Sequence, residues 1–210
     1  PKGLSEVMRM HRAAVPARAR RGLLRPLPAM DLPFLVLVVL SYIAGRLFPE
    51  IPATILTYFN EVVADSGIVR DDGSFSALAL FGNNLRAMVM TVLYGFIPFL
   101  FLPALSLGIN AVILGVMAAY YSNEGISLLA FFAGILPHGV FELPALILSL
   151  AAGLFLCQSI NAYIRHNEKG VMKPLLLNLL RLVALVVLPL LIVAAVMEAY
   201  VTPVVMQLFL

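Results

Sequence analysis

Residues 136–153 read LPHGVFELPALILSLAAG, an apolar stretch that holds one carboxylate, Glu142, and one imidazole, His138. Hydrophobic side chains make up 62% of the 210 residues and charged ones 12%, and the mean hydropathy is +1.01. An average soluble domain is only about half apolar. The sequence therefore predicts an all-α protein, a polytopic transmembrane helix bundle over 31–210, and leaves no room for a separate soluble catalytic domain.

Basic side chains before the first apolar segment indicate the orientation of the chain. Segment 1–30 carries Lys2, Arg9, Arg12, Arg18, Arg20, Arg21 and Arg25 against the single Glu6. By the positive-inside rule, we expect this N-terminal segment to be cytoplasmic. It holds no aromatic side chain that could stack on a base, so we expect no nucleic-acid partner.

Five crossings are predicted from the apolar segments. They are 32–48, 77–102, 105–121, 126–160 and 174–200. The segment 49–75 should form an outer loop, because its acidic residues outnumber its basic ones and its apolar residues recur at helical spacing, as in an amphipathic helix.

The segment 126–160 needs a separate argument, because it is too long for one straight span of about 20 residues and short for two. Basic residues follow it at Arg165, Lys169 and Lys173, so the positive-inside rule requires an odd number of crossings. We expect one crossing that is broken at 137–144, where the prolines interrupt the helix. The whole chain then has five crossings with one broken helix.

Glu142 is the residue that hydrocarbon tolerates least. His138 precedes it by one helical turn, so both side chains share a helix face. Arg86, in the second span, is the expected charge partner, and Arg181 is the competing one. The predicted buried polar cluster consists of His138, Glu142, Asn83, Asn84, Arg86 and Asn110. Its favoured role is a structural tie between helices, and the alternative is an ion, proton or substrate site.

The polar residues within the predicted spans also argue against catalysis. A zinc peptidase needs three protein ligands, and His138 is the only histidine within the predicted spans. Ser106 and Ser149 lack the G-x-S-x-G context of a nucleophile. We therefore expect no enzyme activity, no catalytic residue, no metal and no cofactor. The small-residue pairs Ala111–Gly115 and Ser149–Gly153 predict close packing within the chain, with a homodimer interface as the weaker option.

Three motifs together resemble the stage II sporulation protein M (SpoIIM) family. They are LFGNNLRA at 80–87, the Gly108-Ile109-Asn110 to Gly115 stretch, and the opening 136–153 string. The resemblance covers 77–153 and implies a five-span membrane protein with a non-enzymatic role. In sporulating members, that role is to anchor peptidoglycan-degrading partners, the stage II sporulation proteins D and P, at the septal membrane.

The functional expectation combines the resemblance with the residue inventory. We expect a multi-pass protein of the cytoplasmic membrane that acts as a scaffold or subunit of a membrane complex, linked to cell-envelope remodelling. Its partners would be the lipid bilayer and other membrane or envelope proteins. The alternative is an ion-, proton- or small-solute-translocating protein that uses His138 and Glu142.

Overall fold

The structure is a computed structural model that describes residues 28–166 and 172–209. Most of the basic N-terminal segment and Lys169 lie outside the described residues. The first helices are α3 (Pro28–Leu47), α4 (Glu50–Asp65), α5 (Ala77–Leu93), the short 3₁₀ turn η1 (Tyr94–Phe96), α6 (Leu102–Asn123) and α7 (Leu128–His166). A last long helix divides into α8 (Met172–Leu182), η2 (Val183–Val187), α9 (Leu188–Val196), η3 (Met197–Val201) and α10 (Thr202–Gln207).

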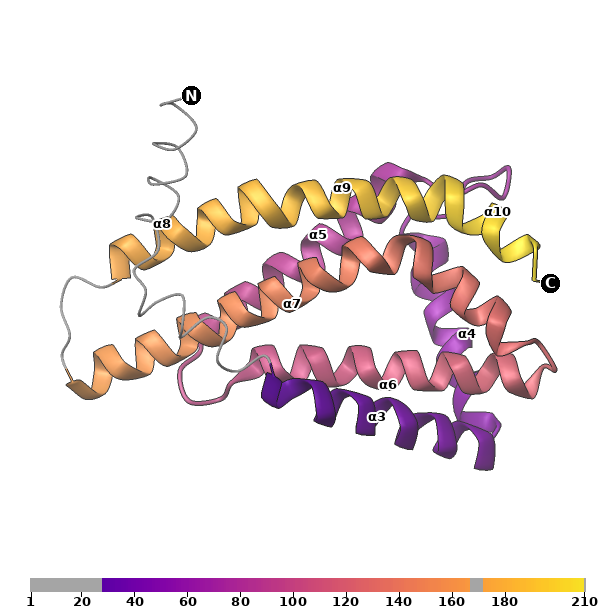
Figure 1. Cartoon of the computed structure of the whole chain (residues 1–210), viewed down its shortest axis with the longest axis horizontal. Helices are drawn as coiled ribbons and strands as arrows, with labels where there is room; N and C mark the ends of the chain where they lie inside the picture. Colours follow the sequence, from indigo (N-terminus) through magenta and orange to yellow (C-terminus); the bar gives the residue numbers. More distant parts are fainter. Residues whose placement is uncertain (1–27, 167–171, 210) are drawn as a thin grey trace, which may run out of the picture.

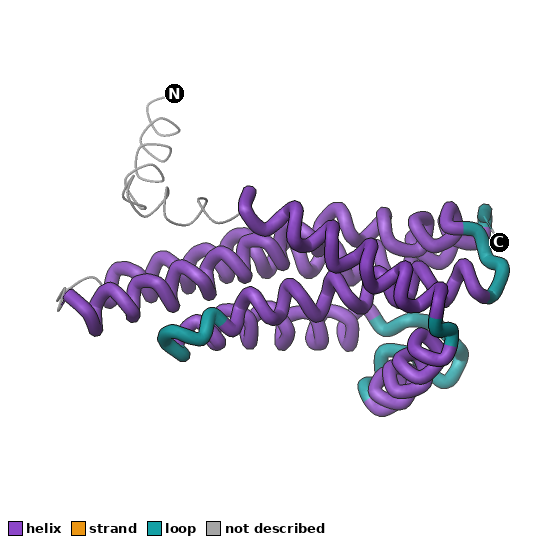
Figure 2. Tube along the Cα trace, turned by 90° about the horizontal axis from the view of Figure 1, so that it is seen from below, coloured by secondary structure: helices purple, strands orange, loops and turns teal. Residues whose placement is uncertain are grey.

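The predicted membrane bundle is confirmed. Four of the described helices are long and apolar enough to cross a membrane, namely Ala77–Phe96, Leu102–Asn123, Leu128–Arg165 and Met172–Gln207. A fifth crossing is counted only if Leu32–Leu47 and Glu50–Tyr58, which meet at an angle of 109°, together form one bent span. The predicted helix within 49–75 is present as α4, and Figure 2 shows it turned away from the long axis of the bundle.

The long helices run side by side along one axis (Figure 1). α3 packs along α6, while α7 contacts α5, α6 and α9. We call the end of the bundle where α6 leads into α7 the Asn123 end, and the end where α5 leads into α6 the Phe99 end. At the Asn123 end, the Arg46 guanidinium donates to Asn123 Oδ1 at 2.8 Å, and Asn123 Nδ2 donates to the Gly45 carbonyl at 2.9 Å.

The predicted break at 137–144 is wrong in one respect, because α7 remains α-helical through both Pro137 and Pro144. Each proline removes one backbone donor and displaces the preceding turn, and this bends a helix whose neighbours hold both halves in place. Figure 1 shows the bend in α7. A single bent crossing replaces the two half-helices.

Two π-helical turns interrupt the last helix, and each lies just before a proline. Pro189 follows η2 and Pro203 follows η3. A proline cannot donate to the carbonyl four residues earlier, so the ladder widens locally. Accordingly, the Leu188 N–H bonds to the Val183 carbonyl and the Thr202 N–H bonds to the Met197 carbonyl, five residues back in both cases.

The connection between the second and third spans differs from the predicted turn. Ser76 caps α5 as its Oγ accepts from the Ala79 N–H at 3.3 Å, but α5 ends at Leu93 and the next helix begins at Leu102. The chain reverses over 97–101 with positive φ angles of 68° at Phe99 and 47° at Phe101. The Phe99 N–H donates to Asn161 Oδ1 of α7 at 3.1 Å, which fixes the reversal. Cys157 lies beneath it, fully buried, with Sγ 3.5 Å from the Ile97 carbonyl.

Small residues let the helix backbones approach, as the sequence predicted. Gly115 of α6 faces α3 so closely that a Cβ there would overlap the Val38 carbonyl oxygen and lie 2.8 Å from Ser41 Cβ. Gly153 of α7 faces the Thr91 carbonyl and Pro103 in the same way. Both predicted small-residue pairs therefore serve packing within the chain.

We predict that Gly115→Ala destabilises the bundle by about 1–3 kcal/mol, because the added methyl meets backbone that cannot move aside. Gly82→Ala is the matched control, since a Cβ on Gly82 meets nothing within 4 Å. Thermal unfolding in detergent should show a lower midpoint for Gly115→Ala and none of that loss for Gly82→Ala. Equal midpoints for the two variants would contradict the α3–α6 contact.

Candidate functional site

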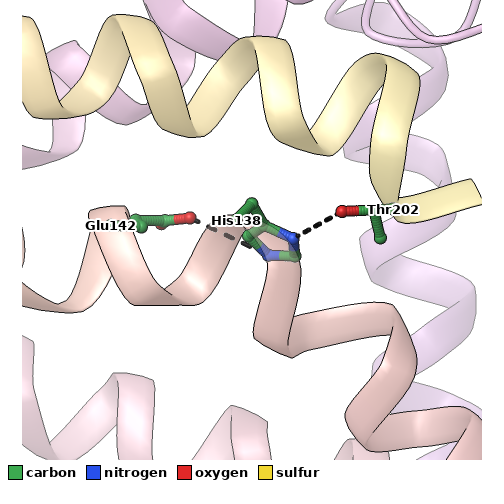
Figure 3. A network of polar contacts seen from close by, with 3 residues as sticks. All are labelled: His138, Glu142 and Thr202. Carbon is green, nitrogen blue, oxygen red and sulfur yellow. Dashed lines mark hydrogen bonds and ion pairs between the residues drawn. The ribbon is translucent and has the colours of Figure 1, made fainter. Parts of the chain in front are cut away.

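His138 lies at the bend of α7 between two polar side chains (Figure 3). Its Nδ1 is 3.2 Å from Thr202 Oγ1 of α10. Its Nε2 is 4.0 Å from Glu142 Oε2, one turn further along α7. The His138 side chain is 15% exposed and that of Glu142 is 29% exposed, so both are mostly covered by the bundle.

Glu198 of η3 is the third ionisable residue of this site, and the sequence analysis missed it. One ligand atom from each of His138, Glu142 and Glu198 lies within 4.8 Å of the other two. The Oε2 atom of Glu198 is buried and has no hydrogen-bond partner among the described residues. We call His138, Glu142 and Glu198 the His-Glu-Glu cluster.

Packing on either side of the cluster orients the two carboxylates. Ala195 and Ala199 flank Glu198 in the helix and are buried against Leu80 and Ile68. On α7, the turn after Glu142 is buried through Ala145 and Leu146 against Met88 of α5 and Val187 and Leu191 of the last helix. The apolar neighbours therefore hold α7 and η3 together, and the polar side chains meet between them.

The cluster lies well inside the spanning helices. At the helical rise, Glu198 is about 14 Å from Gln207 at the end of α10. His138 is about 15 Å along α7 from Leu128, before the bend. Both helix ends belong to the Asn123 end of the bundle (Figure 1). The three side chains therefore lie about two to three helical turns in from the ends of helices long enough to cross a membrane, and an ionised group inside such a span requires compensation.

The other predicted members of the polar cluster are not joined to it. Asn83, Arg86 and Asn110 are exposed, and Asn84 is half-buried. Asn110 Nδ2 donates to the Ser106 carbonyl of its own helix at 2.8 Å. Among the described residues Arg86 lies within ion-pair distance of no acid, and the one such contact found there, between His138 and Glu142, is an ion pair only when the histidine is protonated. The expected Arg86–Glu142 pair is therefore wrong, and so is the competing pair with Arg181, which is exposed on α8.

The electrostatics of the cluster are those of a cation-binding or proton-sharing site. Two carboxylates and one imidazole meet, and no described arginine or lysine pairs with either acid. Like charges at this separation in a medium of low dielectric cannot both remain uncompensated. The expectation of no metal rested on finding only two ligands, and Glu198 raises that number to three.

A sequence signal for Glu198 exists, although it is weak. The chain from Leu182 to Leu210 holds no lysine or arginine, and Glu198 is its one acid. The predicted span ended near Tyr200, where an acid would lie at the membrane surface and need no partner. The helix continues to Gln207, which moves Glu198 inward. Pro203, which precedes the helix end, marks the widened turn that contains this residue.

Comparisons with known proteins identify the family of the chain. The chain is 28% identical over 172 residues to an uncharacterized protein of Methanocaldococcus jannaschii, which covers 80% of this chain and 93% of that protein. No solved structure matches the chain. The family model described as stage II sporulation protein M matches residues 32–203, which include the whole His-Glu-Glu cluster. The chain therefore belongs to the stage II sporulation protein M family.

Proposed function

We propose that the chain is a non-catalytic subunit of a protein complex in the cytoplasmic membrane, oriented with its N-terminus inside, where it holds other membrane or envelope proteins. The observation that carries this proposal is the position of Arg86. It lies near the middle of the Ala77–Phe96 span, exposed, and without an ion pair to any described residue.

An arginine in that position requires a partner. On insertion scales, arginine at the centre of a spanning helix costs about 2.5–3.5 kcal/mol, and snorkelling relieves this cost only near helix ends. The face of α5 that carries Phe81, Leu85 and Met88 packs against α7 and the last helix. Arg86 therefore projects from another face of α5, away from the buried core of its own chain.

Amides on the outside of the bundle support the same conclusion. Asn83 precedes Arg86 by one turn on α5 and is exposed. Asn110 of α6 is also exposed and uses its Nδ2 within its own helix, so its Oδ1 is available to another donor. Asparagine in spans commonly hydrogen-bonds across helices. A partner helix that bears a carboxylate opposite Arg86 fits the face of α5 that carries Asn83 and Arg86.

Family membership supports the membrane setting of the proposal. The family takes its name from sporulation, which involves remodelling of the cell envelope. The similar protein of Methanocaldococcus jannaschii is uncharacterized and gives no activity. A subunit role requires none of the chemistry of a catalytic site.

The subunit role predicts a complex that depends on Arg86. In mild detergent extracts of native membranes, the wild-type chain should migrate above its 22.8 kDa monomer mass plus detergent. Arg86→Leu should return it to the monomer, because the partner carboxylate loses its counterion. Arg86→Lys, which keeps the positive charge, is the matched control and should retain part of the complex. A wild-type chain that migrates as a monomer would refute the proposal, as would an Arg86→Leu chain that remains assembled.

The separation of Arg86 from the cluster gives a second prediction. A double-mutant cycle with Arg86→Leu and Glu142→Gln should show a coupling energy within about 0.5 kcal/mol of zero, because the two residues share no contact. Thermal unfolding of the purified chain in detergent measures it. A coupling above about 1 kcal/mol would restore the direct Arg86–Glu142 pair.

Translocation of protons or cations is the second candidate function, and the His-Glu-Glu cluster favours it. Ionisable groups inside spanning helices frequently line ion or proton pathways. This role predicts flux across liposomes that hold the purified chain, with loss of the flux in Glu142→Gln. Glu124→Gln, a change at an exposed carboxylate of the Asn123 end, should leave the flux intact. Flux with these properties would replace the subunit role, and its absence would remove the second candidate.

A further inference from the structure

We propose that the His-Glu-Glu cluster binds one divalent transition-metal ion of the Zn²⁺ class, which ties α7 to the last helix. This site goes beyond the subunit role and does not depend on it. Its geometry is the first argument. Ligand atoms about 2.1 Å from a tetrahedral Zn²⁺ lie roughly 3.4 Å apart. The three candidate atoms lie within 4.8 Å of one another, so each pair is within about 1.4 Å of that spacing.

The distance between His138 and Glu142 is the second argument. At 4.0 Å, Nε2 and Oε2 are too far apart to share a hydrogen bond directly. The separation is close to that of two ligands on one metal ion. Glu198 Oε2 is buried without a hydrogen-bond partner among the described residues. A buried carboxylate oxygen left without a partner is unfavourable, and a metal ion would satisfy it.

Charge balance is the third argument. Two ionised carboxylates and a neutral imidazole carry a charge of −2, and a divalent cation brings the sum to zero. A neutral assembly is the form that the membrane interior accepts at least cost. A monovalent cation would leave one negative charge, and among the described residues no lysine or arginine forms an ion pair with either acid.

Metal-bound histidines commonly donate their second ring N–H to a neighbouring acceptor, and Thr202 can be that acceptor for His138. Its Oγ1 is 3.2 Å from His138 Nδ1, so it can accept the proton on that nitrogen. The neutral tautomer with Nδ1 protonated leaves the Nε2 lone pair free on the side of Glu142. Thr202 is 8% exposed, so this hydrogen bond is shielded from competing water. The ring is thereby fixed with its coordinating atom toward Glu142 (Figure 3).

The donor set selects the class of metal. Mg²⁺ and Ca²⁺ take oxygen ligands in coordination shells of six or more. Imidazole with two carboxylates suits Zn²⁺ and its neighbours in the first transition row, and three protein ligands leave a fourth position open. We therefore expect Zn²⁺ to bind and Mg²⁺ not to compete with it.

Metal binding to the whole purified chain in detergent tests the proposal. After removal of metals with a chelator, the chain is equilibrated with Zn²⁺, and bound zinc is measured by mass spectrometry. We expect one Zn²⁺ per chain for the wild type and for Glu124→Gln. Glu198→Gln and His138→Ala should each lose most of the binding, and Thr202→Val should weaken it about 10- to 100-fold. Zn²⁺ should raise the unfolding temperature of the wild type and of Glu124→Gln, and should leave that of Glu198→Gln and His138→Ala unchanged.

Two outcomes would overturn the proposal. One is a folded wild-type chain that takes up no Zn²⁺ after chelation. The other is equal zinc binding by the wild type, Glu198→Gln and His138→Ala. The isosteric Glu198→Gln guards against a trivial loss of folding, provided that its metal-free unfolding temperature matches the wild type. Neither outcome bears on the Arg86-dependent complex, so the two proposals fail separately.

Discussion

Hydrocarbon provides no hydrogen bonds to a carboxylate, so an acid inside a spanning helix has to find compensation within the protein. Glu142 and Glu198 lie on different helices and face the same imidazole. The three side chains can therefore be compensated together, as a single cluster without net charge. Apolar packing of α7 against the last helix, to which Ala145 and Leu191 contribute, brings the two carboxylates together. The bend of α7 and the widened turn at η3 are the backbone features that place these side chains within reach of one another.

In this bundle proline bends or widens a helix, although its missing backbone N–H would by itself suggest that the helix ends there. Pro144 and Pro203 each remove one donor, yet the helices that contain them continue. A helix end in lipid would expose four unsatisfied carbonyls, whereas a bend or a π turn leaves far fewer. The membrane therefore favours distortion over termination. This preference explains why the expected break at 137–144 became a bend.

The sequence was sufficient for a bundle of membrane-length helices and for two of the three residues of the His-Glu-Glu cluster. Hydropathy located the spans because each must be long and apolar enough to cross the same bilayer. The four-residue spacing of His138 and Glu142 placed both side chains on one helix face, independently of the helices around them. Arg86 was misassigned because the rotation of α5 about its axis depends on which residues pack, here Phe81, Leu85 and Met88. Glu198 was missed because its depth depends on where the last helix ends, and ends are the least certain feature of a sequence pattern.

Cys157, the one cysteine of the chain, lies fully buried beneath the reversal that joins α5 to α6. A thiol in that position is shielded from water-soluble maleimides and from disulfide exchange as long as the bundle is folded. The native chain therefore behaves toward such reagents as if it had no cysteine. A single cysteine introduced at either end of the bundle would be the one site to label, which permits the membrane orientation to be determined without altering the native residue.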